Sequence, residues 1–164
     1  MSGSFGFFNY RYENGLYVPV ICVPQEGQSH KRYSGQYNMF VGKWESSDGH
    51  ITLNNGRKVR NSLATAMRET KEEGFPTDKM IGQFEYMATV NHTPIYAFRI
   101  KPGTSRQDFV SNNETVGMNY FPVASYCNIS PNYEIRDING INRRVSKFHI
   151  QTIMKCWNKI IKFQ

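Results

Sequence analysis

The sequence has few cysteines and no long apolar run. Cys22, Cys127 and Cys156 are far apart and odd in number, which matches neither a disulfide framework nor a metal-binding cysteine cluster. No segment approaches the roughly 18–20 consecutive apolar residues that a membrane-spanning helix needs. The opening residues MSGSFGFFNYRYENG also lack the apolar core of a signal peptide. We therefore expect a cytoplasmic protein with no membrane partner.

Acidic residues are outnumbered by basic ones. The chain has 13 Asp and Glu against 20 Lys and Arg, a formal net charge of +7. A basic balance favours polyanionic partners such as nucleotides, other polyphosphates or RNA. The 164 residues are 39% hydrophobic and 14% aromatic, enough for one ordinary core. With no repeat and no long linker, the sequence predicts a single domain over residues 1–164.

Strand signals dominate the first half of the chain. Two β-rich runs flank Asn14-Gly15, a pair typical of a tight hairpin. YNMFVGKWE predicts a core strand that contains Gly42, and the segment 46–58 predicts a small hairpin around Asn54-Asn55-Gly56. Later, GQFEYMATV and PIYAFRI predict two antiparallel strands joined by NHT. MNYFPV is a further, shorter extended segment.

Two helices complete the pattern. The first has Ser62 as its expected N-cap and Gly74 as its stop. The second is expected over the amphipathic stretch VSKFHIQTIMKCWNKII. The order strands, helix, strands, helix predicts an α/β protein with a mixed β-sheet between helices. The first helix should pack on the sheet through a stripe formed by Leu63, Ala66, Met67 and Thr70.

Three glutamates, Glu69, Glu72 and Glu73, crowd the end of the first helix. Acids at the negative pole of a helix, and like charges four residues apart, are each mildly destabilising. Carboxylates are also the ligands that Mg²⁺ or Mn²⁺ prefers. A solvated charged face and a metal site both remain open from spacing alone. Arg68 can reach Glu72 one turn later and hold its orientation.

The segment RETKEEGF resembles the core of the Nudix box, in which Arg-Glu precedes Glu-Glu and a glycine. Gly42 in FVGKWE stands where that box begins, and NNETVGMNYFPV is similar to the later segment where many members carry an acidic residue. There are departures from the box. Thr70 replaces an aliphatic residue, Gly74 comes one place early, and Arg60 stands where the box glutamate is expected. An insertion covers residues 46–58.

The resemblance implies a Nudix hydrolase with an α/β/α sandwich fold that uses Mg²⁺ or Mn²⁺. The metal ligands would be Glu69, Glu72, Glu73 and the carbonyl of Gly42, with Arg68 orienting one carboxylate. The general base would be Glu73 or Glu114, with Glu85 a weaker candidate. The candidate substrate contacts are Trp44, which could stack on a base, and the cations Arg11, Lys31, Arg32, Lys43 and Arg57.

Three functions remain open at this stage. The first is a pyrophosphohydrolase acting on a nucleotide sugar, ADP-ribose, a dinucleoside polyphosphate or an RNA 5′ end. The second is a catalytically impaired Nudix-like module that binds nucleotides or RNA, suggested by Arg60 and the shortened box. In the third, the glutamates are a solvated surface with no site. The sequence does not decide the oligomeric state, and the insertion could be a lid, a partner contact or a homodimer arm.

Overall fold

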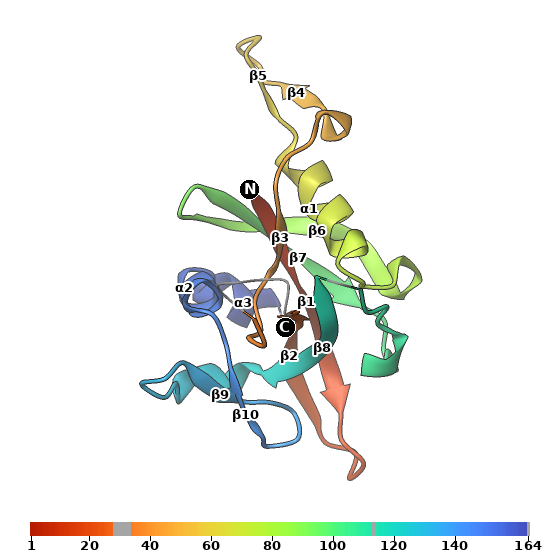
Figure 1. Ribbon diagram of the computed structural model, residues 1–164, viewed down its shortest axis with the longest axis vertical. Helices are drawn as coiled ribbons and strands as arrows, with labels where there is room; N and C mark the ends of the chain where they lie inside the picture. Colours follow the sequence, from red (N-terminus) through yellow and green to blue (C-terminus); the bar gives the residue numbers. More distant parts are fainter. Residues whose placement is uncertain (28–33, 113, 164) are drawn as a thin grey trace.

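The computed structural model describes residues 1–27, 34–112 and 114–163. Six strands form one sheet in the order β6–β7–β1–β2–β8, with β3 beside the start of β1 (Figure 1). The sheet is mixed because β1 pairs in parallel with β7 and antiparallel with β2 and β3. Its strands are β1 (Ser2–Arg11), β2 (Tyr17–Glu26), β3 (Phe40–Gly42), β6 (Met80–Val90), β7 (Thr93–Ile100) and β8 (Thr115–Pro122).

Two short ribbons and three helices surround this sheet. The ribbons are β4 (His50–Thr52) with β5 (Lys58–Arg60), and β9 (Glu134–Arg136) with β10 (Asn142–Arg144). The helices are α1 (Ser62–Glu72), α2 (Lys147–Lys155) and α3 (Trp157–Phe163). No helix of the described residues is both long and apolar enough to cross a membrane. Short 3₁₀ turns occur at Ser46–Asp48, Thr77–Lys79, Arg106–Asp108 and Val123–Cys127.

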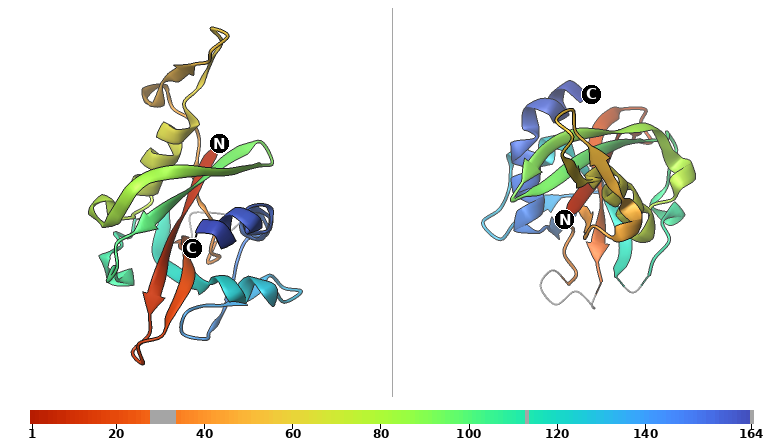
Figure 2. Two further views of the ribbon diagram at one scale, coloured as in Figure 1. Left: turned by 180° about the vertical axis from the view of Figure 1, so that it is seen from behind. Right: turned by 90° about the horizontal axis from the view of Figure 1, so that it is seen from above.

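Alternation along the central strands divides the core between the two faces of the sheet. Phe5 and Phe7 of β1 pack with residues of α2 and α3, whereas Phe8 belongs to a second cluster. The second cluster lies on the α1 face, because successive side chains of a strand point to opposite sides and Ser4 contacts α1. Figure 2 shows α1 and the blue helices α2 and α3 on different sides of β1. The predicted mixed α/β architecture with a mixed sheet is confirmed.

The predicted hairpins are present. Gly15 has a φ of 86° in the β1–β2 turn, and Gly56 has a φ of 82° between β4 and β5. Asn91 and His92 both have positive φ between β6 and β7, the geometry of tight antiparallel turns. The core strand expected over YNMFVGKWE is shorter than predicted, because only Phe40–Gly42 enters the sheet.

Helix α1 begins one residue earlier than expected, at a different cap. The Oδ1 of Asn61 accepts a hydrogen bond from the backbone N–H of Ala64 at 3.1 Å, so Asn61 is the N-cap and Ser62 is the first helical residue. Asparagine and serine cap equally well, so sequence alone did not separate them. The predicted stop is confirmed: Gly74 follows the C-cap with a φ of 110°, where a Cβ would collide with the carbonyl of Val110.

The predicted apolar stripe of α1 is wrong in part. Ala66 and Thr70 are buried as predicted, but Leu63 and Met67 are 37% and 49% exposed, and Thr65 is buried in their place. The reason lies in β1, which presents serines rather than large apolar residues to this helix. The Thr70 hydroxyl donates to the Ala66 carbonyl at 2.6 Å, so the Ser4 hydroxyl donates to Thr70 at 2.5 Å. This buried pair explains why a hydroxyl at residue 70 is compatible with the packing of α1 on β1.

The single C-terminal helix of the prediction is two helices. Helix α2 ends at a C-cap, Cys156, and α3 starts at Trp157. Ile153, Cys156 and Ile160, which lie on one side of the predicted helix, are buried against the sheet despite this break. Val145 is buried as well, but it lies before α2 rather than in it.

The Ser4–Thr70 pair can be tested by a double-mutant cycle. Thr70→Val leaves the buried Ser4 hydroxyl without its acceptor, so the free energy of unfolding should fall by about 1–3 kcal/mol in urea titrations. Adding Ser4→Ala should recover part of this loss, because two apolar groups then face each other. Thr152→Val is the matched control, since the Thr152 hydroxyl is buried but bonds only the Phe148 carbonyl of its own helix. A double variant less stable than Thr70→Val would contradict this reading.

Candidate functional site

The end of α1 lies against β3, which brings two of the predicted glutamates to the start of the sheet. The backbone N–H of Val41 donates to Oε2 of Glu73 at 3.0 Å. Gly42 lies directly beneath Glu69, because a Cβ built on Gly42 would overlap that carboxylate. The Thr115 hydroxyl donates to the Glu73 carbonyl at 2.5 Å and so joins β8 to the helix end. Glu69, Glu73 and Gly42 therefore share one small region.

A further carboxylate, Glu26 at the end of β2, joins this region. Glu26 and Glu73 are only 4% and 5% exposed. Burial raises the pKa of Glu26 to about 7, and the nearby Glu114 charge adds to the rise. Burial and the negative charges of Glu26 and Glu69 raise the pKa of Glu73 well above its usual range. Neither Glu26 nor Glu73 forms an ion pair with any residue that the structure describes.

Glu26, Glu69, Glu72 and Glu73 form a carboxylate cluster at this end of the sheet, and Arg68 organises its outer part. Its Nη1 donates to Glu69 Oε1 and to Glu72 Oε2, both at 2.9 Å. Its Nη2 donates to the Lys43 carbonyl at 2.7 Å, which links α1 to the residue after Gly42. Arg68 therefore reaches Glu72 as predicted. Glu72 itself is 54% exposed, so the three glutamates occupy different environments.

The main partner of Arg68 is Asp48, which lies in the insertion. Nε and Nη2 of Arg68 donate to the two Asp48 oxygens at 2.8 and 3.0 Å. The Thr65 hydroxyl and the Glu45 N–H also donate to Asp48, at 2.8 and 2.9 Å. These hydrogen bonds hold the pKa of Asp48 well below its usual range, against the opposing effect of burial. Asp48 is thus the buried carboxylate that fixes the guanidinium of Arg68.

Sequence reasoning missed both Asp48 and Glu26. Asp48 lies 20 residues before Arg68, so no helical or motif spacing connects the two. The signal for Glu26 was weak, since an acid at the end of an apolar strand is normally solvated. The available clue was its place between Gln25 and Gly27, where a strand meets a loop.

The two other candidate bases lie at opposite edges of the sheet. Glu114 is exposed just before β8, and its backbone carbonyl accepts from Gly27 N at 2.7 Å. Its negative charge contributes to the raised pKa of Glu26, Glu69 and Glu73, so it belongs to the cluster. Glu85 is exposed on β6, at the edge of the sheet farthest from β8.

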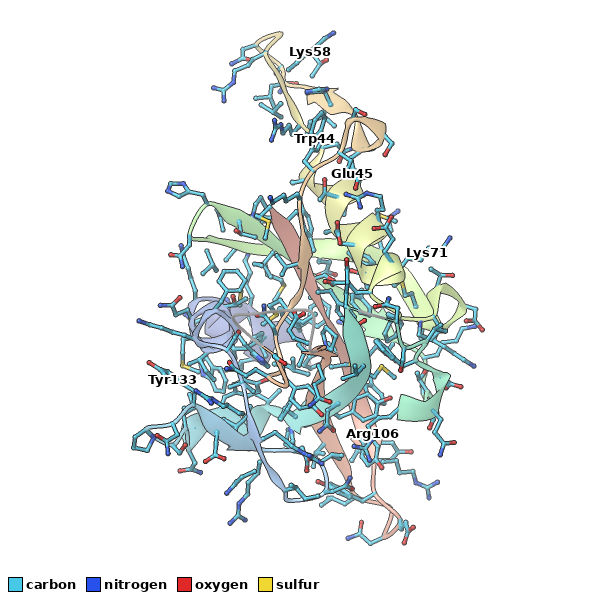
Figure 3. The ribbon with its side chains drawn as sticks, in the orientation of Figure 1. Trp44, Glu45, Lys58, Lys71, Arg106 and Tyr133 are labelled. Atoms are coloured by element: carbon cyan, nitrogen blue, oxygen red, sulfur yellow. The ribbon has the colours of Figure 1, made fainter. Side chains whose placement is uncertain are left out.

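The predicted substrate contacts are only partly gathered. Lys43 follows Gly42 and is exposed. The Trp44 ring donates from Nε1 to the Gly49 carbonyl at 2.8 Å, and the Arg60 guanidinium lies over it at 4.5 Å, so the ring stabilises the base of the β4–β5 ribbon. Arg57 precedes Lys58, which lies far out on that ribbon (Figure 3). Lys31 and Arg32 lie outside the described residues. Arg11 is at the other end of β1.

The types of side chain at this site suit a metal ion, but their present positions do not form a metal-binding group. Among residues 1–27, 34–112 and 114–163, no three His, Cys, Asp or Glu side chains lie close enough together to hold an ion. The donor chemistry does fit a hard divalent cation, because the buried carboxylates Glu26 and Glu73, whose pKa values are raised, have no positively charged partner among the residues that the structure describes. To complete the coordination shell of a metal ion, carboxylates such as those of Glu69 and Glu72 would have to rotate away from Arg68, which now holds them.

Comparisons with known proteins do not assign this chain to a family. No model of a known protein family matches the chain, and no curated protein matches it either. The order of residues from Arg68 to Phe75 and the geometry of the carboxylate cluster are therefore the features that bear on function.

Replacing Asp48 tests its role as the anchor of Arg68. Asp48→Asn removes the charged acceptor from a largely buried guanidinium, so we expect the free energy of unfolding to fall by about 2–3 kcal/mol. Asp78→Asn, at an exposed acid of similar type, should change it by less than about 0.5 kcal/mol. Both can be measured by urea unfolding at pH 7. Equal effects of the two substitutions would show that Asp48 is not an anchor.

The buried state of Glu26 predicts an unusual pH dependence in EDTA. Its pKa is raised from 4.5 to about 7 in the folded protein, so the unfolded chain loses this proton first. Stability associated with Glu26 is thus fully present below pH 4.5 and is lost as the pH rises to about 7. In Glu26→Gln, the free energy of unfolding should fall less over this window than in the wild type. Glu13→Gln, at an exposed acid, should show the same pH dependence as the wild type. If the free energy of unfolding of Glu26→Gln ran parallel to that of the wild type from pH 4.5 to 7, Glu26 would not have the raised pKa.

Proposed function

We propose that the chain is a Nudix-type hydrolase that cleaves a pyrophosphate bond in a nucleoside diphosphate derivative with Mg²⁺ or Mn²⁺. The observation that carries this proposal is the concentration of desolvated carboxylates, Glu26, Glu69 and Glu73, where α1 ends over Gly42. The resemblance of Arg68–Phe75 to the Nudix box implies metal-binding carboxylates at this end of α1. The position of α1 on one face of the sheet, with α2 and α3 on the other, supports a Nudix-like α/β/α sandwich.

The residues that would hold the metal are Glu69, Glu72, Glu73 and the carbonyl of Gly42. A bound divalent ion would neutralise the diphosphate, stabilise charge on the leaving phosphate and lower the pKa of a water nucleophile. Without such an ion, the cluster would repel a negatively charged substrate, since the carboxylates and the diphosphate carry charge of the same sign.

Arg68 and Asp48 position the catalytic end of the helix. Because Asp48 binds two nitrogens of Arg68, the guanidinium has a fixed plane from which it holds Glu69 and Glu72. Arg68 therefore acts on the substrate only through these carboxylates.

Glu73 and Glu114 are the residues that would take the proton from water. Glu73 is the candidate inside the cluster, because its Oε2 accepts from the Val41 N–H and its Oε1 is left to take a proton. Glu114 is exposed and close enough to the cluster to influence three of its carboxylates. Suitable substrates are nucleotide sugars, ADP-ribose, dinucleoside polyphosphates and RNA 5′ ends.

A specific observation favours the second candidate, a Nudix-like module that binds nucleotides or RNA without turnover. The segment 49–67 contains no Asp or Glu but carries Arg57, Lys58 and Arg60. Much of this segment forms the β4–β5 ribbon, which projects from the body of the molecule (Figure 1). A basic ribbon of this kind fits a polyanion. The two candidates share the carboxylate cluster and differ in what happens after the substrate binds.

Substitution of Glu73 separates these two candidates. The wild type is incubated with the four substrate types and Mg²⁺ or Mn²⁺, and release of phosphate or nucleoside monophosphate is measured. For a hydrolase, Glu73→Gln should lower the rate by at least about 100-fold, because a base and a carboxylate ligand are lost together. Glu85→Gln, at the distant exposed acid, should retain activity.

No product from any substrate with the wild type would contradict hydrolysis. Retained binding of the same nucleotides or RNA would then favour the binding module. A wild-type rate that survives in Glu73→Gln would instead show that the cluster is not the reactive centre.

A further inference from the structure

A pocket lies at the other end of β1, apart from the carboxylate cluster. Its volume is about 650 Å³, and it is lined by the end of β1, the start of β2 and the segment 102–106. Gly42 pairs with Ser2, whereas the pocket begins at Phe8. Six residues of strand at roughly 3.3 Å each place it roughly 20 Å away along β1. Figure 3 likewise shows Arg106, which lines the pocket, at the opposite end of the molecule from Trp44.

Aromatic side chains form one wall of this pocket. Phe8, Tyr10, Tyr17 and Tyr120 all line it. The Tyr120 ring packs against Phe8 and Tyr10 with centroids 5.0 and 5.8 Å apart, and its hydroxyl donates to the Thr104 carbonyl at 2.8 Å. Tyr17 is 60% exposed and so has ring surface available for a ligand. The wall is therefore largely preformed and offers flat apolar surface.

The charged residues that line the pocket are both basic. Arg11 and Arg106 line it, and no Asp or Glu is among its lining residues. Arg106 Nη1 donates to Asn119 Oδ1 at 3.2 Å, a neutral acceptor that orients the guanidinium without neutralising it. The nearby buried Asp137 is paired with Arg143 instead, at 3.0 Å. Two guanidinium groups beside aromatic rings favour a ligand that carries both an anion and a planar ring.

The backbone of β1 is open at the same place. The pairing of β1 with β7 extends only to Phe7, so one edge of the last residues of β1 has no partner strand among the described residues. Its N–H and C=O groups can therefore accept or donate hydrogen bonds to a ligand. A bound peptide strand would gain few ladder bonds from an edge of four residues, Phe8 to Arg11, which makes a compact ligand the better fit.

We propose that this pocket binds the nucleoside monophosphate unit of a nucleotide or of an RNA strand. The phosphate lies at Arg11 and Arg106, and the base packs against Tyr10 and Tyr17, where stacking tolerates any base. The volume is within the range of small-molecule sites. This binding is independent of metal and of the carboxylate cluster, so it does not depend on the proposed hydrolysis.

Equilibrium binding in EDTA tests the proposal on the full chain. The probes are AMP, inorganic phosphate, adenosine and a short RNA with a 5′-monophosphate. AMP should bind more tightly than phosphate or adenosine alone, because only AMP uses both the arginines and the tyrosines. Arg106→Gln and Tyr17→Ala should each weaken AMP binding about tenfold, the usual effect of losing one charged hydrogen bond or one stacked ring. Lys101→Gln, a matched loss of charge at an exposed neighbour outside the lining, should have no effect.

The other outcomes identify the ligand or overturn the proposal. Equal affinity for AMP and RNA supports a free nucleotide as the ligand, and tighter RNA binding supports an RNA strand. Unchanged AMP affinity in Glu73→Gln confirms that the two sites are separate. The proposal is overturned by no AMP binding at millimolar concentration, by binding that Arg106→Gln and Tyr17→Ala leave intact, or by phosphate binding as tightly as AMP. Tighter binding of an acidic peptide than of AMP would overturn it in favour of strand addition.

Discussion

Negative charge removed from water where α1 meets β3 is the constraint on which the candidate site depends. Glu26 and Glu73 are buried, Glu69 lies over Gly42, and the charges of Glu26 and Glu69 raise the energetic cost of ionising Glu73. Buried charge is strongly unfavourable unless it is paired or bound to a metal. Two hydrogen bonds hold Glu73 in this position despite that cost. Its side chain accepts from the Val41 N–H, and its carbonyl accepts from the Thr115 hydroxyl. A site so arranged is suited to bind a cation.

The rest of α1 is built to hold that position. Ser4 and Thr70 bring the helix close to β1 through small side chains, and Gly74 allows the chain to turn where a larger residue would meet Val110. Arg68 and Asp48 then join the helix to the insertion. The insertion is therefore part of the site at its base, although the β4–β5 ribbon projects beyond it. Local packing, the helix end and the carboxylate cluster form one connected arrangement.

Features encoded by neighbouring residues could be predicted from the sequence, and those set by distant contacts could not. Asn14-Gly15 and Gly74 specify backbone geometry locally, so the first hairpin and the end of α1 were found. Asp48 meets Arg68 only because the segment 46–58 folds back onto α1, and no spacing rule predicts that contact. Likewise, Leu63 and Met67 looked like core because the serines of β1 that face α1 were not yet placed. The pocket at Arg106 depends on segments separated by more than a hundred residues.

Diffraction from a crystal soaked in manganese, with the anomalous signal used to locate the ion, is the most direct measurement of the central claim. The account predicts manganese at the end of α1, bound by Glu73 and Glu69 beside the Gly42 carbonyl, with carboxylates turned away from Arg68 to complete the shell. An empty site at saturating manganese, with Glu69 and Glu72 still on Arg68, would contradict the claim that these acids are gathered to bind a cation.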